Sequence, residues 1–404
     1  MEMAGVALRS RVDQVQMLAS GAALALLLAL TGCGAFFQCE GKSDCPASST
    51  GTGTGTGTGS GSDYVYISNS ASGSTDINGF DISSGALTPT SGSPYSLGFV
   101  PVAMAITPSD TYMYISSGVA IMGYSIGTDG ALTILNTGGS SGTTLEEENC
   151  GAIAISPDGQ WLFSLNTNDL TIEEYSIPSS TGIISPVANY QITNSFGGAI
   201  LSSSIEVAPS GAFIAVGLGT AGTEIFSFNT STGAATYASQ IEAVSSTSGD
   251  YAVAIDTNNN LYVGATNNLY RYSVTSAGLP TQVSTSATGT SGPNSVALAG
   301  TAYVYAGSEN ATSTSTTPII SGFTASTSNP MAQVSGSPNT GPTRVSAIGV
   351  DKTGAYLVAA GYNSTSGIQL FSIGSAGALT PVSSSGSAGT GTTTIIPTVM
   401  ALTH

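Results

Sequence analysis

Charged side chains are scarce in this 404-residue chain, and basic ones are almost missing. Charged residues make up 7% of the chain, six Lys and Arg stand against 23 Asp and Glu, and the formal net charge is −17. Proteins that bind nucleic acid need Lys and Arg to neutralise phosphates. The composition therefore excludes a nucleic-acid-binding protein, and it favours neutral or cationic partners over anionic ones.

Histidine is nearly absent as well, because the chain has a single one, His404, at its last position. A Ser-His-Asp triad or a histidine-rich metal site is therefore not expected. Glu146, Glu147 and Glu148 are three adjacent acids that offer the oxygen ligands Ca²⁺ prefers. Consecutive side chains rarely face one ion, and no EF-hand spacing accompanies them. A solvated acidic loop is favoured, so we expect no metal and no cofactor, with Ca²⁺ as the open alternative.

The chain has one long apolar run, over residues 18–30, preceded by Arg9 and Arg11. It is too short to span a bilayer comfortably and is typical of a signal peptide. It ends in LTGC (residues 30–33), which resembles the lipobox cleaved by the bacterial lipoprotein signal peptidase. The resemblance implies that residues 1–32 are removed, that Cys33 is lipidated, and that Gly34 directs the protein to the outer membrane. An ordinary secretory signal is the alternative.

Residues 33–62 lead from this cysteine into a run of Gly alternating with Thr and Ser, which predicts a flexible tether. Cys39 and Cys45 flank a short loop, and an oxidising compartment favours a disulfide between them. Two cysteines alone cannot form a closed zinc site. Cys150 starts a predicted strand, where we expect a small buried side chain rather than a reactive thiol.

One strand pattern recurs along residues 63–404 at intervals of about 43 to 52 residues, which is the spacing of four-stranded propeller blades. The copies are AMAITP (103–108), AIAISP (152–157), IEVAPS (205–210), AVAIDT (252–257), SVALAG (295–300), AIGVDK (347–352) and VMALTH (399–404). No partner strand follows the last copy, but DYVYISN (63–69) at the other end can supply one. The sequence therefore predicts an all-β, seven-bladed β-propeller closed by pairing of its first and last strands, which removes free sheet edges.

Each repeat continues with a turn, an aromatic-rich strand and often a GALT segment, as at Gly85, Gly130 and Gly377. Through SPDGQWLFSLN (156–166) and the GALT segments, residues 63–404 resemble the lactonase-like seven-bladed propellers, which include 6-phosphogluconolactonase-type enzymes. The resemblance implies opening of a lactone at the central channel. Enzymes of that family carry His and Arg where their innermost strands begin, and this chain keeps only Arg344 there. We therefore expect an envelope-anchored, non-catalytic binding scaffold, with a hydrolase of sugar or acyl lactones as the alternative.

Candidate site residues lie on the innermost strands and on the loops that enter them. Glu206 stands where the other copies have Ala or Gly, and a buried carboxylate at such a place marks either a site or a hydrogen-bonded structural group. Glu206 and Arg344 are the catalytic candidates. The ligand-binding candidates are Glu146, Glu147, Glu148, Asn149, Asp250 and Arg344. Asn149 and Arg344 align in one column and are expected to face each other across the channel. The expected partners are the membrane, through the lipid anchor, and a carbohydrate or protein.

Overall fold

The computed structural model describes residues 63–69, 75–135, 144–146, 150–244, 249–288, 292–308, 320–325, 330–342, 345–361, 367–385 and 399–404. The predicted signal peptide, the tether, Cys33, Cys39 and Cys45 lie outside these residues, as do Glu147, Glu148, Asn149 and Arg344. Every described strand lies within residues 57–404. The described residues contain no α-helix, and so none that could cross a membrane.

The strands form seven antiparallel blades, as predicted, which we number in chain order. Blade 1 contains β29 (Met400–Leu402), β1 (Tyr64–Asn69), β2 (Asp76–Asp81), β3 (Thr88–Pro89) and β4 (Tyr95–Ser96). Blade 2 contains β5 (Ala103–Ile106), β6 (Tyr112–Ser116), β7 (Ala120–Ile126), β8 (Leu132–Ile134) and β9 (Thr144–Glu146). Blade 3 contains β10 (Cys150–Ile155), β11 (Trp161–Asn166), β12 (Thr171–Ser176) and β13 (Ser185–Gln191).

Blade 4 contains β14 (Ile200–Val207), β15 (Phe213–Gly219), β16 (Thr223–Phe228) and β17 (Ala235–Ile241). Blade 5 contains β18 (Asp250–Ile255), β19 (Asn260–Ala265), β20 (Asn268–Val274) and β21 (Pro280–Ala287), and joins blade 4 through one bridge, Gly219 to Asp250. Blade 6 contains β22 (Pro293–Ala299), β23 (Tyr303–Ser308) and β24 (Ile320–Thr324). Blade 7 contains β25 (Val345–Val350), β26 (Tyr356–Gly361), β27 (Ile368–Ile373) and β28 (Leu379–Ser385).

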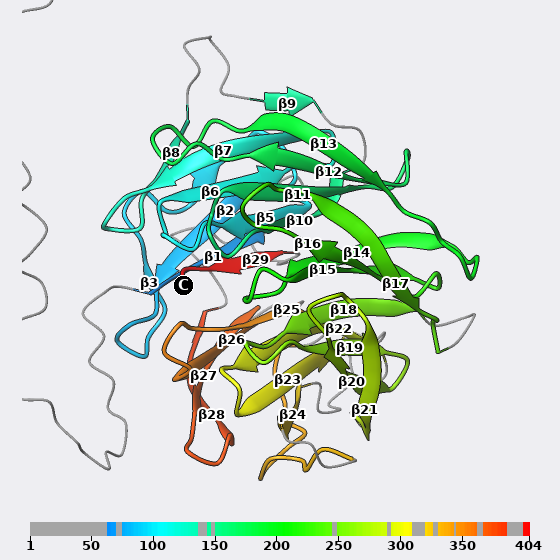
Figure 1. Cartoon of the computed structure of the whole chain (residues 1–404). Helices are drawn as coiled ribbons and strands as arrows, with labels where there is room; N and C mark the ends of the chain where they lie inside the picture. The colour runs from blue at the N-terminus through cyan, green and yellow to red at the C-terminus, as the bar shows by residue number, and fades with distance from the viewer. Residues whose placement is uncertain are drawn as a thin grey trace, which may run out of the picture. The chain divides into compact units, whose positions relative to one another are not determined.

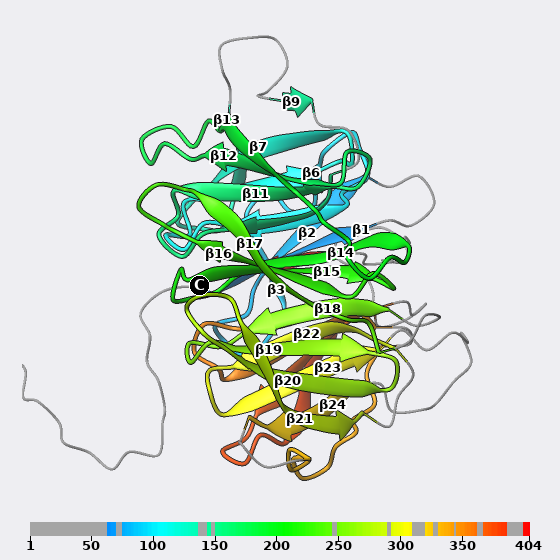
Figure 2. The same cartoon turned by 45° about the vertical axis from the view of Figure 1, so that its right-hand side comes forward.

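The innermost strands form a closed ring. Each contacts the next in the order β29, β5, β10, β14, β18, β22 and β25, and β25 contacts β29 again. Figures 1 and 2 show the blades following one another, and Figure 1 shows the red β29 beside the blue β1. The innermost strands all correspond to the repeated pattern of the sequence, so its period is the period of the blades.

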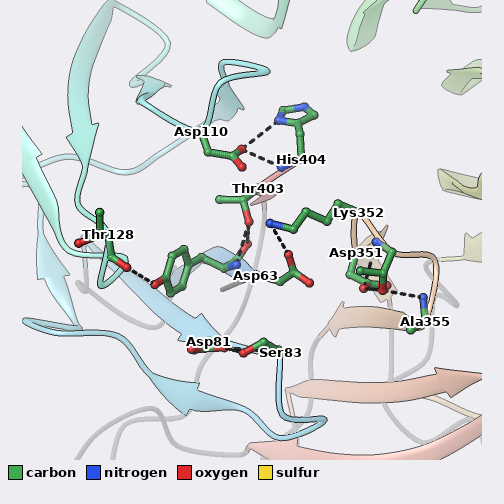
Figure 3. Close-up of polar contacts among 12 residues, drawn as sticks. Asp63, Asp81, Ser83, Asp110, Thr128, Asp351, Lys352, Ala355, Thr403 and His404 are labelled. Carbon is green, nitrogen blue, oxygen red and sulfur yellow. Dashed lines mark hydrogen bonds and ion pairs between the residues drawn. The ribbon is translucent and has the colours of Figure 1, made fainter. Parts of the chain in front are cut away.

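The ring is closed by the pairing that the split repeat predicted. β29 lies antiparallel to β1, with Tyr66 opposite Ala401. The Tyr64 backbone N–H donates to Thr403 Oγ1 at 2.8 Å, and the Thr403 N–H donates to the Tyr64 carbonyl at 3.0 Å. An ion pair of 2.8 Å between Lys352 of blade 7 and Asp63 adds a contact beside this junction (Figure 3).

A repeated tyrosine contact joins neighbouring blades. The fully buried Tyr114 in β6 donates its hydroxyl proton to the carbonyl of Gly182 in blade 3 at 2.7 Å. Gly182 has φ 65°, and a Cβ there would lie 2.6 Å from the ring of Tyr112. The same contact recurs at 2.8 Å for Tyr66 with Gly130 and for Tyr305 with Gly377. The recurring aromatic strands and GALT glycines are therefore two halves of one inter-blade contact.

Apolar cores fill the spaces between blades. Phe163 of blade 3 meets Phe228 of blade 4 edge to face, with ring centroids 5.2 Å apart. Cys150 is buried, and the Ser164 hydroxyl donates to its sulfur at 2.9 Å. Aromatic side chains of the second and third strands thus pack between blades, and Cys150 is the small buried residue that its position predicted.

Candidate functional site

The innermost strands of blades 1 to 4 line a cavity of about 420 Å³. Ligand pockets in proteins have volumes of about 300–1,000 Å³, so this space suits a small molecule. We call the end of the channel where the innermost strands begin the entry end, and the opposite end the exit end. The cavity extends from mid-strand toward the exit end, and its wall includes one repeated column, Ala105, Ala154, Glu206 and Ala401.

Glu206 is the acidic side chain among the lining residues of this cavity. It lies on β14 opposite Ala215 and retains partial exposure within the channel. Burial raises the pKa of Glu206 to about 7, and a hydrogen bond from the backbone of Ile255 in blade 5 partly opposes this rise. A carboxyl group with a pKa near the working pH can both accept and donate a proton.

His404 lines the same cavity, which the sequence reasoning did not anticipate. It stands three residues after Ala401, in the column that holds Pro108, Pro157 and Pro209 in blades 2 to 4. Its backbone N–H donates to Asp110 Oδ1 at 2.7 Å, and its ring Nδ1 lies 3.4 Å from that oxygen (Figure 3). A carboxylate beside Nδ1 orients the ring and favours a proton on that nitrogen. The repeats already align His404 with Pro108 and Pro157, but the sequence does not show that this column faces a cavity.

The described basic side chains do not line the cavity. Lys352 occupies the same column as His404 in blade 7, and its amine is bound to Asp63 at 2.8 Å. The hydrogen bond to Asp63 raises the pKa of Lys352, whereas burial raises the pKa of Asp63 despite the lysine. Arg271 is buried in blade 5, where its Nη2 donates to Asn260 Oδ1 at 3.0 Å.

The predicted ligand-binding acids are not brought together in the part of the chain that the structure describes. Glu146 ends β9, which pairs with β7, the third strand of blade 2, and β9 lies at the periphery in both views (Figures 1 and 2). Asp250 is only 1% exposed, and the Thr223 hydroxyl donates to its Oδ2 at 3.0 Å. Burial raises the pKa of Asp250 to about 7, with the Thr223 hydrogen bond opposing the rise. Asp250 is therefore a carboxylate of the blade 4–5 junction, away from the lining of the cavity.

Four further carboxylates outside the predicted site are buried between or within blades: Glu174, Glu224, Asp256 and Asp351. Glu224 accepts hydrogen bonds from the Thr193 and Asn194 backbone amides, the shorter at 2.6 Å. Glu174 is 1% exposed and accepts a 2.6 Å hydrogen bond from the Tyr190 hydroxyl, and burial raises its pKa. Among the described residues, no three His, Cys, Asp or Glu side chains gather as a metal site would require. Glu206 is therefore distinguished from the other buried acids by facing open space.

No protein-family model matches the sequence, and no curated protein matches it. The fold is similar to that of the periplasmic gluconolactonase PpgL of Pseudomonas aeruginosa, with a TM-score of 0.65 and 10% identity over 85% of this chain and 99% of that chain. It is also similar to a candidate 6-phosphogluconolactonase of Bacteroides uniformis, with a TM-score of 0.64 and 15% identity over 84% and 99% of the two chains. The RRP9 WD40 repeats match less closely, with a TM-score of 0.52 and 11% identity over 72% and 81%. These likenesses establish the lactonase-like seven-bladed fold, and chemistry has to be argued from the cavity.

Proposed function

We propose that this protein is a lactone hydrolase in which Glu206 acts as the general base in the central cavity. The carrying observation is a lone carboxylate on the wall of a ligand-sized cavity, with burial raising its pKa to about 7. The similarity to PpgL, a gluconolactonase, supports the same reaction class. The case for a non-catalytic scaffold rested on the lack of histidine at the entry end, and it is weaker because His404 lines the cavity from the other end.

The reaction follows from proton transfer at two groups. The Glu206 carboxylate takes a proton from water as the water oxygen attacks the lactone carbonyl. The tetrahedral oxyanion needs a hydrogen-bond donor, which the His404 ring supplies from Nε2 as the imidazolium, because in the neutral ring the proton lies on Nδ1 beside Asp110. The ring C–O bond then breaks, and the protonated Glu206 returns its proton to the leaving alkoxide. The product is the open hydroxy acid, and Asp110 keeps the His404 ring in place.

Glu206→Gln tests this assignment in the full-length protein with a panel of sugar and alkyl lactones. We expect hydrolysis to fall at least about 100-fold, because a general base contributes about 10²–10⁴ to the rate. The wild-type rate should rise with pH through about 7, where Glu206 loses its proton. Glu242→Gln is the matched control, since Glu242 is exposed and lies outside the cavity.

An unchanged rate in folded Glu206→Gln would remove Glu206 from the mechanism. Wild-type rates equal to buffer across the panel would reject the hydrolase and restore the scaffold, with a carbohydrate or protein partner at its loops.

We further propose that the enzyme works at the cell envelope, held at the outer membrane by a lipid on Cys33. The LTGC segment and the Gly-rich residues up to 62 support this placement.

A further inference from the structure

We infer that the cavity takes an uncharged lactone carrying an alkyl substituent, rather than a phosphorylated or polyhydroxylated sugar lactone. This inference rests on the proposed hydrolase function for its reaction, but the binding preference follows from the cavity wall and from the charges of the chain.

The side chains that line the wall are almost all apolar. Thirteen of the fifteen lining residues have apolar side chains, and the exceptions are Glu206 and His404. A sugar lactone brings several hydroxyl groups, and each one buried without a partner loses its hydrogen bonds to water. Two polar side chains cannot satisfy a sugar ring, whereas they suffice for one ester group.

The positions of the small and large side chains fit a ligand with one polar ester group and an apolar substituent. Ala105, Ala154 and Ala401 share the column of Glu206 and leave space in front of its carboxylate. Ile106, Ile155 and Leu402 follow them in sequence and line the same cavity. A lactone group placed at Glu206 would therefore have branched aliphatic side chains beside it, which suits an alkyl substituent.

The charges of the protein also favour an uncharged ligand over a phosphorylated one. A phosphate group is normally bound by Arg or Lys, and the described basic side chains are held elsewhere, Lys352 by Asp63 and Arg271 by Asn260. A phosphorylated ligand in this cavity would also lie near Glu206 in a chain of net charge −17. The electrostatic field therefore opposes an anionic substrate.

Binding to the full-length Glu206→Gln protein tests the inference without relying on turnover. The probes are δ-lactones with alkyl chains of increasing length, δ-gluconolactone and 6-phosphogluconolactone, measured by titration calorimetry. We expect alkyl lactones to bind about fourfold more tightly for each added methylene, since each buried CH₂ contributes about 0.8 kcal/mol. Ala105→Leu in the same background should weaken this binding at least tenfold by filling the cavity. Ser109→Leu adds the same side chain at an exposed position outside the cavity and should leave binding unchanged.

The outcomes separate the two proposals. Chain-length-dependent binding that Ala105→Leu abolishes upholds the substrate class, and wild-type turnover of those lactones then upholds the hydrolase too. The same binding without any turnover rejects the hydrolase alone. Preferred binding and hydrolysis of 6-phosphogluconolactone or δ-gluconolactone overturn the substrate class and keep the hydrolase. Alkyl lactones that bind without dependence on chain length, or that bind Ala105→Leu unchanged, also overturn the substrate class.

Discussion

Glu206 occupies a backbone position that six other blades fill with Ala or Gly: Ala105, Ala154, Ala254, Ala297, Gly349 and Ala401. Each of these seven residues lies opposite a residue of the next strand in its blade, so Glu206 differs from the others in its side chain. Burial makes the ionised form of Glu206 unfavourable, and only the Ile255 backbone offers a compensating hydrogen bond. The residue is therefore expected to cost stability at alkaline pH, as functional groups often do.

Replacing Glu206 with Gln should remove that cost. The pKa of Glu206 is raised from 4.5 to about 7 on folding, so the folded state holds its proton more tightly than the unfolded state does. The contribution of Glu206 to stability is therefore complete below about pH 4.5 and is lost as pH rises through about 7. One pKa unit corresponds to 1.36 kcal/mol, so Glu206→Gln should gain roughly 1–3 kcal/mol over wild type between pH 5 and pH 8.

Urea unfolding of both proteins at pH 5 and pH 8 measures this gain. Other titrating groups, including Asp250, cancel in the difference between the two proteins. Glu242→Gln should show no pH-dependent difference from wild type. An equal difference at both pH values for Glu206→Gln would mean that Glu206 is not perturbed by burial.

At the scale of elements, the tyrosine contact joins three pairs of neighbouring blades, 1 to 2, 2 to 3 and 6 to 7. Tyr114 places a fully buried hydroxyl against the Gly182 carbonyl in the next blade. Burial raises the pKa of Tyr114, so the hydroxyl stays protonated and remains a donor. The glycine is required because its φ is positive and the neighbouring ring leaves no room for a Cβ.

Tyr114→Phe should therefore lower the free energy of unfolding by about 1–3 kcal/mol, because the Gly182 carbonyl is left buried without its donor. Tyr66→Phe and Tyr305→Phe remove the same contact and should cost a similar amount. Tyr237→Phe is the control, since Tyr237 is 39% exposed, and should change stability by less than about 0.5 kcal/mol. Chemical denaturation gives all four values, and a Tyr114 effect no larger than the control would show that packing alone joins the blades.

For the molecule as a whole, closure depends on a short strand. β29 pairs with β1 over three residue pairs, and its wall residues also form part of the cavity. Thr403 is 4% exposed and accepts the hydrogen bond from the Tyr64 N–H. The junction therefore couples the stability of the ring to the shape of the site.

Thr403→Val keeps the shape of the side chain but removes the acceptor for the buried Tyr64 N–H. We expect a loss of about 1–3 kcal/mol in global stability, seen as a lower melting temperature with the transition still cooperative. Thr236→Val makes the same change on the exposed outer strand β17 and should be nearly neutral. A Thr403→Val protein as stable as wild type would show that the closure hydrogen bond does not limit the stability of the ring.

The last prediction concerns attachment of the whole protein to the membrane. In a bacterial host grown with labelled palmitate, the wild-type chain should carry the label and sediment with the outer membrane. Cys33→Ser should lose both the label and the membrane fraction, because the lipid supplies the affinity. Cys150→Ser serves as the control, and label on the Cys33→Ser chain would reject the anchor.

The sequence by itself determined the seven blades, their order and the closure between residues 63–69 and 399–404, because each blade repeats one hydrophobic pattern and local patterns fix strands. The repeat also identified Glu206 as the exception in its column. Only the tertiary structure decided which polar groups share a space. Glu146 and Asp250 were expected beside the channel, but their positions depend on outer-strand pairing and on burial at a blade junction, which no local pattern encodes. His404 lines the same cavity as Glu206, nearly 200 positions away in the sequence, because ring closure inserts β29 into the ring, three blades from β14.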